Sequence, residues 1–242
     1  MTADHRTVDL NADLGESFGA WTMGDDEALL EVVDRANVAC GFHAGDPLVM
    51  RRTVRRAVQR GVAIGAHPSF PDLQGFGRRR MELAPEELQA MLLYQIGALA
   101  GLCRAEGARL AHVKPHGALN NMACADEALA RTVVQALQAY DPALPLLAPA
   151  HSALERAARA LGQPVLLEVF ADRAYQDDGQ LVPRGQPGAV LHDPDKAVAH
   201  VMAMLQAGGI VTRSGRVLPT PIHSICVHGD SPQAVQTARR LR

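Results

Sequence analysis

Residues 8–16, VDLNADLGE, alternate between aliphatic and polar side chains, as a half-buried β-strand does. In an extended strand Leu10 and Ala12 share one face, whereas Asn11 and Asp13 share the other. A sheet edge with its polar face in water would produce the same alternation. The rest of the chain therefore decides whether this polar face is a solvated surface or a functional site.

One pattern recurs along the 242 residues: a short apolar strand, a polar turn, and a helix with apolar residues at three- and four-residue spacing. Strands are predicted over 8–13, 36–40, 62–67, 109–114, 145–149, 164–170 and 222–228. Helices are predicted over 25–34, 47–60, 85–106, 125–140, 152–161, 194–207 and 231–241. Strands that alternate with helices pair in parallel, and seven such units close most naturally into a barrel with the helices outside.

We therefore expect one α/β domain over residues 1–242, a (β/α) barrel, because barrels of roughly 200–250 residues form single domains. A doubly wound open sheet is the alternative. No G-x-G-x-x-G follows a predicted strand, and the chain has no G-x-x-x-x-G-K-[ST] phosphate loop. Both absences favour the barrel.

Local signals mark the ends of several helices. Three starts carry a capping side chain directly before a proline: Asp46-Pro47, Asp193-Pro194 and Ser231-Pro232. Predicted helix ends carry Gly61, Gly162 and Gly208. The start at Ala84-Pro85 has the proline but no capping oxygen.

Residues 171–192, ADRAYQDDGQLVPRGQPGAVLH, show no periodicity and are rich in Gly, Pro and Asp. A connection of this length is uncommon inside a domain, and it more often serves as a functional lid than as a simple connection. We expect a long loop insertion here.

Five predicted strands finish with an ionisable side chain on the face opposite their aliphatic residues: Asp13, His67, Lys114, Glu168 and His228. Inward residues at the carboxyl ends of barrel strands form the mouth, where chemistry occurs in this architecture. The sequence therefore predicts an active site on the polar face.

Further candidates come from motifs at the same strand ends. His43 lies in NVACGFHAGDP (37–47), where the alternative is a histidine satisfied within a tight turn. Arg78 lies in the Gly-rich loop after His67, which we expect to be mobile and able to cover an anion. Lys114 in VKPHGALN (113–120) offers a point charge for an anion or, with a lowered pKa, a Schiff-base amine.

Composition excludes several classes of protein. The formal charge is −2, and the arginines of RRTVRR (51–56) have the spacing of a solvated helix face, so we expect no nucleic-acid partner. No segment reaches the roughly 18 apolar residues of a membrane span, and MTADHRTVDL lacks a signal-peptide core. The four cysteines are scattered without C-x-x-C, which fits reduced thiols and a cytoplasmic protein.

Seven motifs occur in a fixed order through nearly the whole chain: VDLNADLGESFG, NVACGFHAGDP, IGAHPSFPDLQGFGRR, KPHGAL, EVFADRAY, LVPRGQPGAV and ICVHGD. With them the chain resembles the LamB/YcsF family, the A subunits of ATP-dependent 5-oxoprolinases. The resemblance implies an irregular seven-stranded barrel of the glycoside hydrolase/deacetylase type. It also implies opening of the lactam of 5-oxo-L-proline to L-glutamate with ATP hydrolysis, together with subunits B and C. One departure is Asn120, where the family usually has tyrosine, which puts a ring contact to the ligand in doubt.

The resemblance and the strand ends together give the expected site. The predicted catalytic residues are Asp13, His43, His67, Lys114, His116 and Asp172. The predicted substrate-binding residues are Asn11, Glu16, Arg78, Glu168, Arg173, Arg184 and His228. Because the chain has no phosphate loop, we expect ATP to be bound mainly by the partner subunits, and this chain to open the activated ring with water.

In that scheme Asp13 or Asp172 orients or deprotonates water, the histidines carry protons, and Lys114 with Arg173 neutralises developing negative charge. A metal-dependent amide hydrolase or deacetylase is an alternative, with Zn²⁺ or Mn²⁺ on Asp13, His43 and His67. Two further alternatives are a Schiff-base aldolase using Lys114 and a non-catalytic subunit that binds 5-oxoproline.

Overall fold

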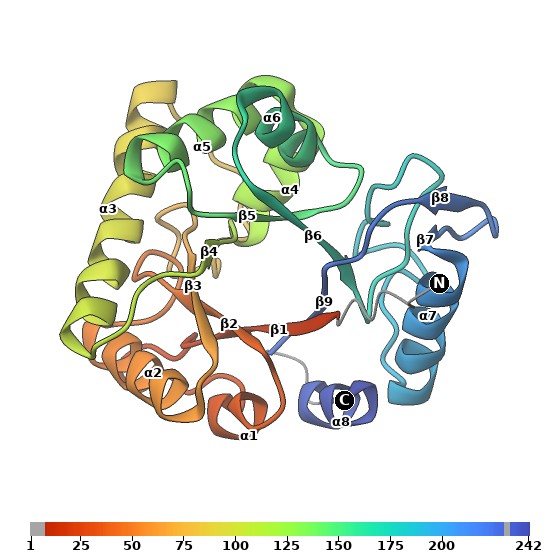
Figure 1. Ribbon diagram of the computed structural model, residues 1–242, viewed down its shortest axis with the longest axis horizontal. Coiled ribbons are helices and arrows are strands. Elements are labelled where there is room, and N and C mark those ends of the chain that lie inside the picture. The colour runs from red at the N-terminus through yellow and green to blue at the C-terminus, as the bar shows by residue number, and fades with distance from the viewer. Residues whose placement is uncertain (1–7, 230–232) are drawn as a thin grey trace, which may run out of the picture.

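The computed structural model describes residues 8–229 and 233–242, and its centre is a closed barrel of parallel strands (Figure 1). The strands follow the order β1-β2-β3-β4-β5-β6-β9 and close by pairing of β9 with β1. Their bounds are β1 (Asp9–Leu14), β2 (Arg35–Ala39), β3 (Ala63–His67), β4 (His112–Val113), β5 (Leu146–Pro149), β6 (Val165–Phe170) and β9 (Ser224–Val227). All seven lie within one residue of predicted strands or inside them, so the prediction of an α/β barrel is confirmed.

Helices surround the barrel (Figure 1). Their bounds are α1 (Asp26–Leu30), α2 (Pro47–Arg60), α3 (Pro85–Ala105), α4 (Gly117–Ala125), α5 (Glu127–Tyr140), α6 (Ala153–Leu161), α7 (Pro194–Ala207) and α8 (Ala234–Leu241). Helix α4 was not predicted, and neither was the antiparallel pair β7 (Gly209–Val211) and β8 (Val217–Pro219). The predicted helix over 25–34 ends earlier, at Leu30.

The predicted caps explain where the long helices begin and end. The Asp46 carboxylate accepts the N–H groups of Leu48 and Val49 at 2.8 and 3.0 Å, and Asp193 caps α7 in the same way. Helices α2, α6 and α7 end at glycines in the left-handed conformation, as predicted. The predicted start at Ser231-Pro232 lies outside the described residues. At the weak start of α3, the Glu87 carboxylate accepts the Ala84 N–H at 2.9 Å.

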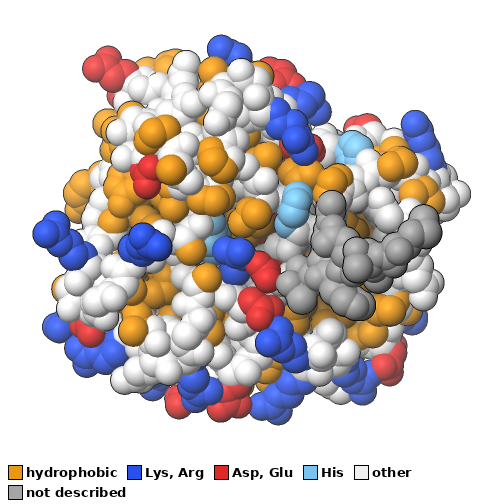
Figure 2. Space-filling view, in the orientation of Figure 1, with side chains coloured by type: hydrophobic (Ala, Val, Ile, Leu, Met, Phe, Trp, Pro, Cys, Tyr) orange, Lys and Arg blue, Asp and Glu red, His pale blue; other side chains and the backbone are white. Residues whose placement is uncertain are grey.

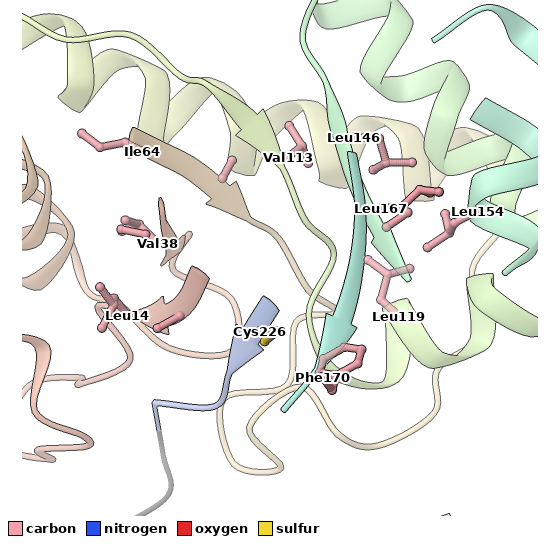
Figure 3. Packing of buried hydrophobic residues seen from close by; sticks show 14 of the residues in the cluster. Leu14, Val38, Ile64, Val113, Leu119, Leu146, Leu154, Leu167, Phe170 and Cys226 are labelled. Carbon is pink, nitrogen blue, oxygen red and sulfur yellow. The ribbon is translucent and has the colours of Figure 1, made fainter. Parts of the chain in front are cut away.

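The two faces of the strands carry different chemistry, as the alternation predicts. Aliphatic residues that point outward, among them Val38, Ile64 and Val113, are buried between the strands and the helices (Figure 3). Leu167 of β6 and Leu154 of α6 belong to the same buried cluster (Figure 3). The inward face is polar, so hydrophobic burial outside the barrel supports a hydrogen-bonded interior.

Gly65 of β3 is required by the packing of this interior. A Cβ atom built on Gly65 would lie 2.1 Å from Nε2 of His112, and that nitrogen is fixed by a 2.7 Å hydrogen bond to Oδ1 of Asn37. We expect Gly65→Ala to lower the free energy of unfolding by about 2–3 kcal/mol, because overpacking would also displace a buried hydrogen-bonded ring. Urea unfolding measures the effect. Gly101→Ala in α3 is the control, since its Cβ meets nothing within 4 Å, and equal losses for both variants would contradict this account.

The formal net charge of −2 leaves neither sign dominant. On the face seen in Figure 2, basic and acidic side chains are interspersed around the periphery. This distribution gives no basic stripe on that face of the kind that tracks a nucleic-acid backbone. Within residues 8–229 and 233–242, no helix combines the length and apolar character needed to cross a membrane.

Candidate functional site

A cavity of about 500 Å³ opens at the carboxyl ends of the barrel strands. Its lining includes groups from β1, β3, β6 and the segments that follow β4 and β9. The predicted residues that line it are Asp13, Glu16, His67, Arg78, Lys114, His116, Arg173, Arg184 and His228. Asn11, His43, Glu168 and Asp172 lie behind this lining and contact residues within it. The polar strand ends therefore meet at one site.

Lys114 occupies the floor of the cavity between two carboxylates. Its Nζ lies 3.1 Å from Oδ1 of Asp13 and 3.2 Å from Oε2 of Glu168. It also lies 3.0 Å from Sγ of Cys226 and 3.3 Å from Oδ1 of Asn11. The three protons of one ammonium are thus committed to protein acceptors. This arrangement fixes the carboxylates, and it does not supply the neutral amine that a Schiff base needs.

The charges on this group follow from burial and pairing. Burial would raise the pKa of Asp13, but His67 and Lys114 hold that pKa well below its usual value, so Asp13 is a carboxylate. Burial would lower the pKa of Lys114, yet Asp13, Cys226 and Glu168 keep it well above the ordinary range. Burial raises the pKa of Glu168 in spite of Lys114. Asp13 is therefore the permanently charged partner of the ammonium.

The layer beneath Lys114 is a network of buried polar side chains that the sequence did not reveal. Asn37 donates from Nδ2 to Oδ1 of Asn11 at 2.8 Å and to Oδ1 of Asp13 at 2.9 Å. Its own Oδ1 accepts from His112 Nε2, and burial lowers the pKa of His112 to about 3, so the ring is neutral. Asn11 also donates to Oγ of Ser224 at 2.8 Å. Because asparagine is depleted in strands, Asn37 between two aliphatic residues was the signal that could have found this network.

One wall of the cavity is a cluster of histidines around Glu16. His67 Nδ1 lies 2.7 Å from the Lys114 carbonyl oxygen, and His116 Nε2 lies 2.9 Å from the Phe76 carbonyl oxygen. The other nitrogens of the two rings, His67 Nε2 and His116 Nδ1, face each other at 2.9 Å. His43 stacks on His116 with ring centroids 3.8 Å apart, and its Nε2 lies 3.3 Å from Oε1 of Glu16. Burial lowers the pKa of both His43 and His116 well below the usual value.

The backbone of the loop after β3 holds this wall in place. Gly77 has a φ of +65°, and a Cβ there would lie 2.2 Å from Ser69 Oγ and 2.9 Å from atoms of His43 and His116. The Asp72 carboxylate ties the loop by accepting the Gly75 N–H at 2.9 Å and by pairing with Arg79. The arginine of this loop that was predicted to face the substrate, Arg78, is exposed at the rim. The mobility expected for the loop stays a prediction.

Another part of the cavity contains a histidine and carboxylate pair. Nδ1 of His228 lies 2.8 and 3.0 Å from the two carboxylate oxygens of Asp172, and its ring stacks on Phe170 with centroids 5.3 Å apart. Burial would raise the pKa of Asp172, but His228 holds it below the usual value. His228 lines the cavity, whereas Asp172 supports it from behind. One His228 ring nitrogen lies within 4.8 Å of a carboxylate oxygen of Asp13.

The long loop between β6 and α7 completes the rim. It corresponds to the loop insertion predicted over 171–192. Arg173 is buried and donates to the carbonyl oxygens of Val182 and Ala189 at 2.7 and 3.3 Å. These hydrogen bonds connect the beginning of the loop to its later part. Arg184 and Arg80 remain exposed at the cavity edge. Asn120 is a buried part of the cavity wall. The rim carries the positive charge that an anionic ligand requires.

Comparisons with known proteins agree with this geometry. The A subunit of 5-oxoprolinase from Azoarcus sp. (strain BH72) is 64% identical over 234 residues, which cover 97% of this chain and 91% of that protein. The crystal structure of a lactam utilization protein from Thermus thermophilus has a TM-score of 0.91 and 46% identity, and the match covers 97% of this chain and 94% of that one. A GH113 β-mannanase from Alicyclobacillus acidocaldarius shares the fold alone, with a TM-score of 0.52, 13% identity and 96% coverage of each chain.

The sequence profile of the LamB/YcsF family matches residues 8–242, which include all seven motifs noted above. The β-mannanase barrel supports the expected glycoside hydrolase type of fold. Since the profile spans nearly the whole sequence and a relative is identical at 64% of the aligned positions, the chain belongs to the LamB/YcsF family.

Proposed function

We propose that this chain opens the lactam ring of 5-oxo-L-proline, as the A subunit of an ATP-dependent 5-oxoprolinase with B and C partner subunits. The observation that carries the proposal is the juxtaposition of Asp13, held by Lys114, with His228, held by Asp172, in one polar cavity. The name of the Azoarcus relative supports both the substrate and the place of this chain in a larger complex. Four free, buried cysteines support a cytoplasmic location for the complex.

The reaction needs an activated carbonyl because amides hydrolyse slowly. In this proposal the partner subunits transfer the γ-phosphoryl group of ATP to the lactam oxygen. Water then adds to the ring carbon, the C–N bond breaks, and the nitrogen leaves with a proton, which gives a γ-acyl phosphate. A second water releases phosphate and L-glutamate. The overall change consumes one ATP and two water molecules and yields ADP, phosphate and glutamate.

Asp13 and His228 are the groups that act on the attacking water. A water molecule between them donates one hydrogen bond to the Asp13 carboxylate and its proton to the free nitrogen of His228. Asp172 holds the Nδ1–H of His228 and stabilises the imidazolium that results. Exposed arginines at the rim, Arg78 and Arg184, neutralise the carboxylate and phosphoryl groups of the activated substrate.

The decisive experiment is reconstitution. Glutamate release from 5-oxo-L-proline and ATP is measured with this chain alone and then with the B and C subunits added. We expect turnover only in the complete mixture, with loss of turnover when this chain is omitted. ATP-dependent glutamate release by the B and C subunits without this chain would remove it from the chemistry.

Replacing Asp172 with asparagine tests the supporting role of this carboxylate. We expect Asp172→Asn to lower kcat of the reconstituted complex by about 10²-fold, because an amide neither fixes the tautomer of His228 nor stabilises its charged form. Asp178→Asn, an exposed acid of the same loop, is the control and should keep its turnover. An unchanged kcat in Asp172→Asn would remove the His228 and Asp172 pair from proton transfer.

A further inference from the structure

The two facing histidines leave a polar contact that their own hydrogens do not satisfy. A backbone carbonyl oxygen only accepts hydrogen bonds, so His67 Nδ1 and His116 Nε2 both carry hydrogen, at 2.7 and 2.9 Å from their carbonyl partners. In two neutral rings the remaining nitrogens then bear lone pairs, yet these nitrogens lie 2.9 Å apart. A cation must lie at this point, either a shared proton or a metal ion.

The position of Glu16 favours a metal ion. Its Oε1 lies 3.5 Å from His116 Nδ1, and a Glu16 oxygen and a His67 nitrogen approach within 4.8 Å. Zn²⁺ bonds of about 2.0–2.1 Å at tetrahedral angles separate neighbouring ligand atoms by roughly 3.3 Å. The 2.9 and 3.5 Å separations bracket that value. A shared proton would account for the contact between the two nitrogens alone, whereas a metal ion also takes the Glu16 carboxylate oxygen beside them as a third ligand.

We propose that Glu16, His67 and His116 bind one divalent transition-metal ion at the cavity wall. All three side chains are buried, with residue exposures of 6%, 1% and 5%, so the ligands are pre-positioned. Both histidines donate their outer N–H to a backbone carbonyl, which is the arrangement that orients metal-binding imidazoles in proteins. Imidazole with carboxylate ligands suits Zn²⁺ and its neighbours in the first transition row.

His43 is a supporting residue in this site although its Nε2 is close enough to be a ligand. An imidazole binds a metal in the plane of its ring, and the rings of His43 and His116 are stacked with only 8° between their planes. One ion therefore cannot lie in both planes. His43 Nε2 instead lies 3.3 Å from Oε1 of Glu16, where its N–H orients the carboxylate.

The sequence suggested Asp13, His43 and His67 as metal ligands. In the proposed site His67 remains, and Glu16 and His116 replace the other two. Asp13 is already paired with Lys114 and accepts from Asn37, and its Oδ2 lies 3.5 Å from His67 Nε2. Three protein ligands leave a position open toward the cavity, as catalytic metal sites do. When bound, such an ion polarises a carbonyl or phosphoryl oxygen or acidifies a bound water molecule.

Metal binding is measured directly on the full chain. Protein stripped with a chelator and dialysed is titrated with Zn²⁺ against a chromophoric chelator, and the bound metal is counted by elemental analysis. Co²⁺ is then added in place of Zn²⁺, and its visible absorption reports the coordination. We expect one ion per chain and a cobalt spectrum typical of low coordination number with nitrogen and oxygen ligands.

Variants separate the ligands from their supports. His67→Ala, His116→Ala and Glu16→Gln should each weaken Zn²⁺ binding by more than about 100-fold, because each removes a ligand. His43→Gln should weaken it by about 10- to 100-fold and keep one ion per chain, as loss of an outer partner does. His192→Ala removes an exposed histidine and should bind as the parent does.

The inference does not depend on the lactam chemistry, because its readout is bound metal. It is overturned if the parent chain binds much less than one Zn²⁺, or if His67→Ala and His116→Ala bind as tightly as His192→Ala. The measurement on the parent chain decides the outcome even where a variant does not fold. Metal binding without 5-oxoprolinase turnover would keep this site and reject only the proposed function.

Discussion

Lys114→Met is expected to lower the free energy of unfolding by about 3–5 kcal/mol and to reduce turnover of the reconstituted complex by about 10³-fold. Methionine preserves most of the side-chain volume, so the change removes charge rather than packing. Asp13 and Glu168 would then be left buried without their shared ammonium, which lies 3.1 and 3.2 Å from them. Urea unfolding gives the first quantity, and glutamate release under saturating substrate gives the second.

A double variant separates the two effects of Lys114. In Lys114→Met/Glu168→Gln one of the stranded carboxylates is gone, so part of the lost stability should return while turnover stays low. Lys196→Met, an exposed lysine of α7, is the matched control and should leave both quantities near those of the parent. Near-normal turnover in Lys114→Met would show that the ammonium has no part in catalysis.

Asp13→Asn is expected to lower kcat by about 10³-fold while ligand affinity changes little. Asparagine has nearly the same shape and keeps an acceptor for Lys114, and the ammonium retains Glu168 at 3.2 Å. The variant should therefore fold, but it lacks the carboxylate that we propose orients water opposite His228. Steady-state kinetics of the complex and equilibrium binding of 5-oxo-L-proline give the two values.

The same variant tests whether the chain only presents its ligand to the partner subunits. A purely binding role predicts that turnover falls only in proportion to affinity, so kcat at saturating substrate would remain near that of the parent. Asp9→Asn is the control on the same strand. Oδ2 of Asp9 lies 2.6 Å from Nε of Arg35, and neither residue is part of the cavity lining. This control variant should retain kcat.

The barrel could be predicted from the sequence because its strands obey a strict rule. Aliphatic residues such as Ile64 and Val113 must face the helices, so every second position in each strand is constrained and the polar partners stand out. The same rule identifies Asp13, His67 and Lys114 as neighbours on one face of the sheet. Alternation alone does not specify which inward residues contact one another.

Side-chain contacts across the barrel account for what was missed. His112 has no motif around it that signals a role, yet its ring fills the space above Gly65 and anchors Asn37. Asp172 was predicted to act on water, and its contact with His228, which places it behind the cavity lining, could not be read from alternation; its catalytic role stays a prediction. Helix α4 escaped prediction because Gly117 and two asparagines, Asn120 and Asn121, lower its helix propensity.

The shortness of β4 has a consequence for local opening of the barrel. It contains two residues, and its register with β5 involves a single pair, Val113 with Leu146. The cylinder thus has a seam with little backbone bonding, directly beside Lys114. Parting of this seam would admit water to amides, imidazoles and carboxylates that hydrate readily, whereas a barrel filled with aliphatic groups would resist wetting. We therefore expect local opening of the barrel to require the least free energy beside Lys114. Among the barrel strands, hydrogen exchange of the backbone amides should be fastest where β4 meets β5.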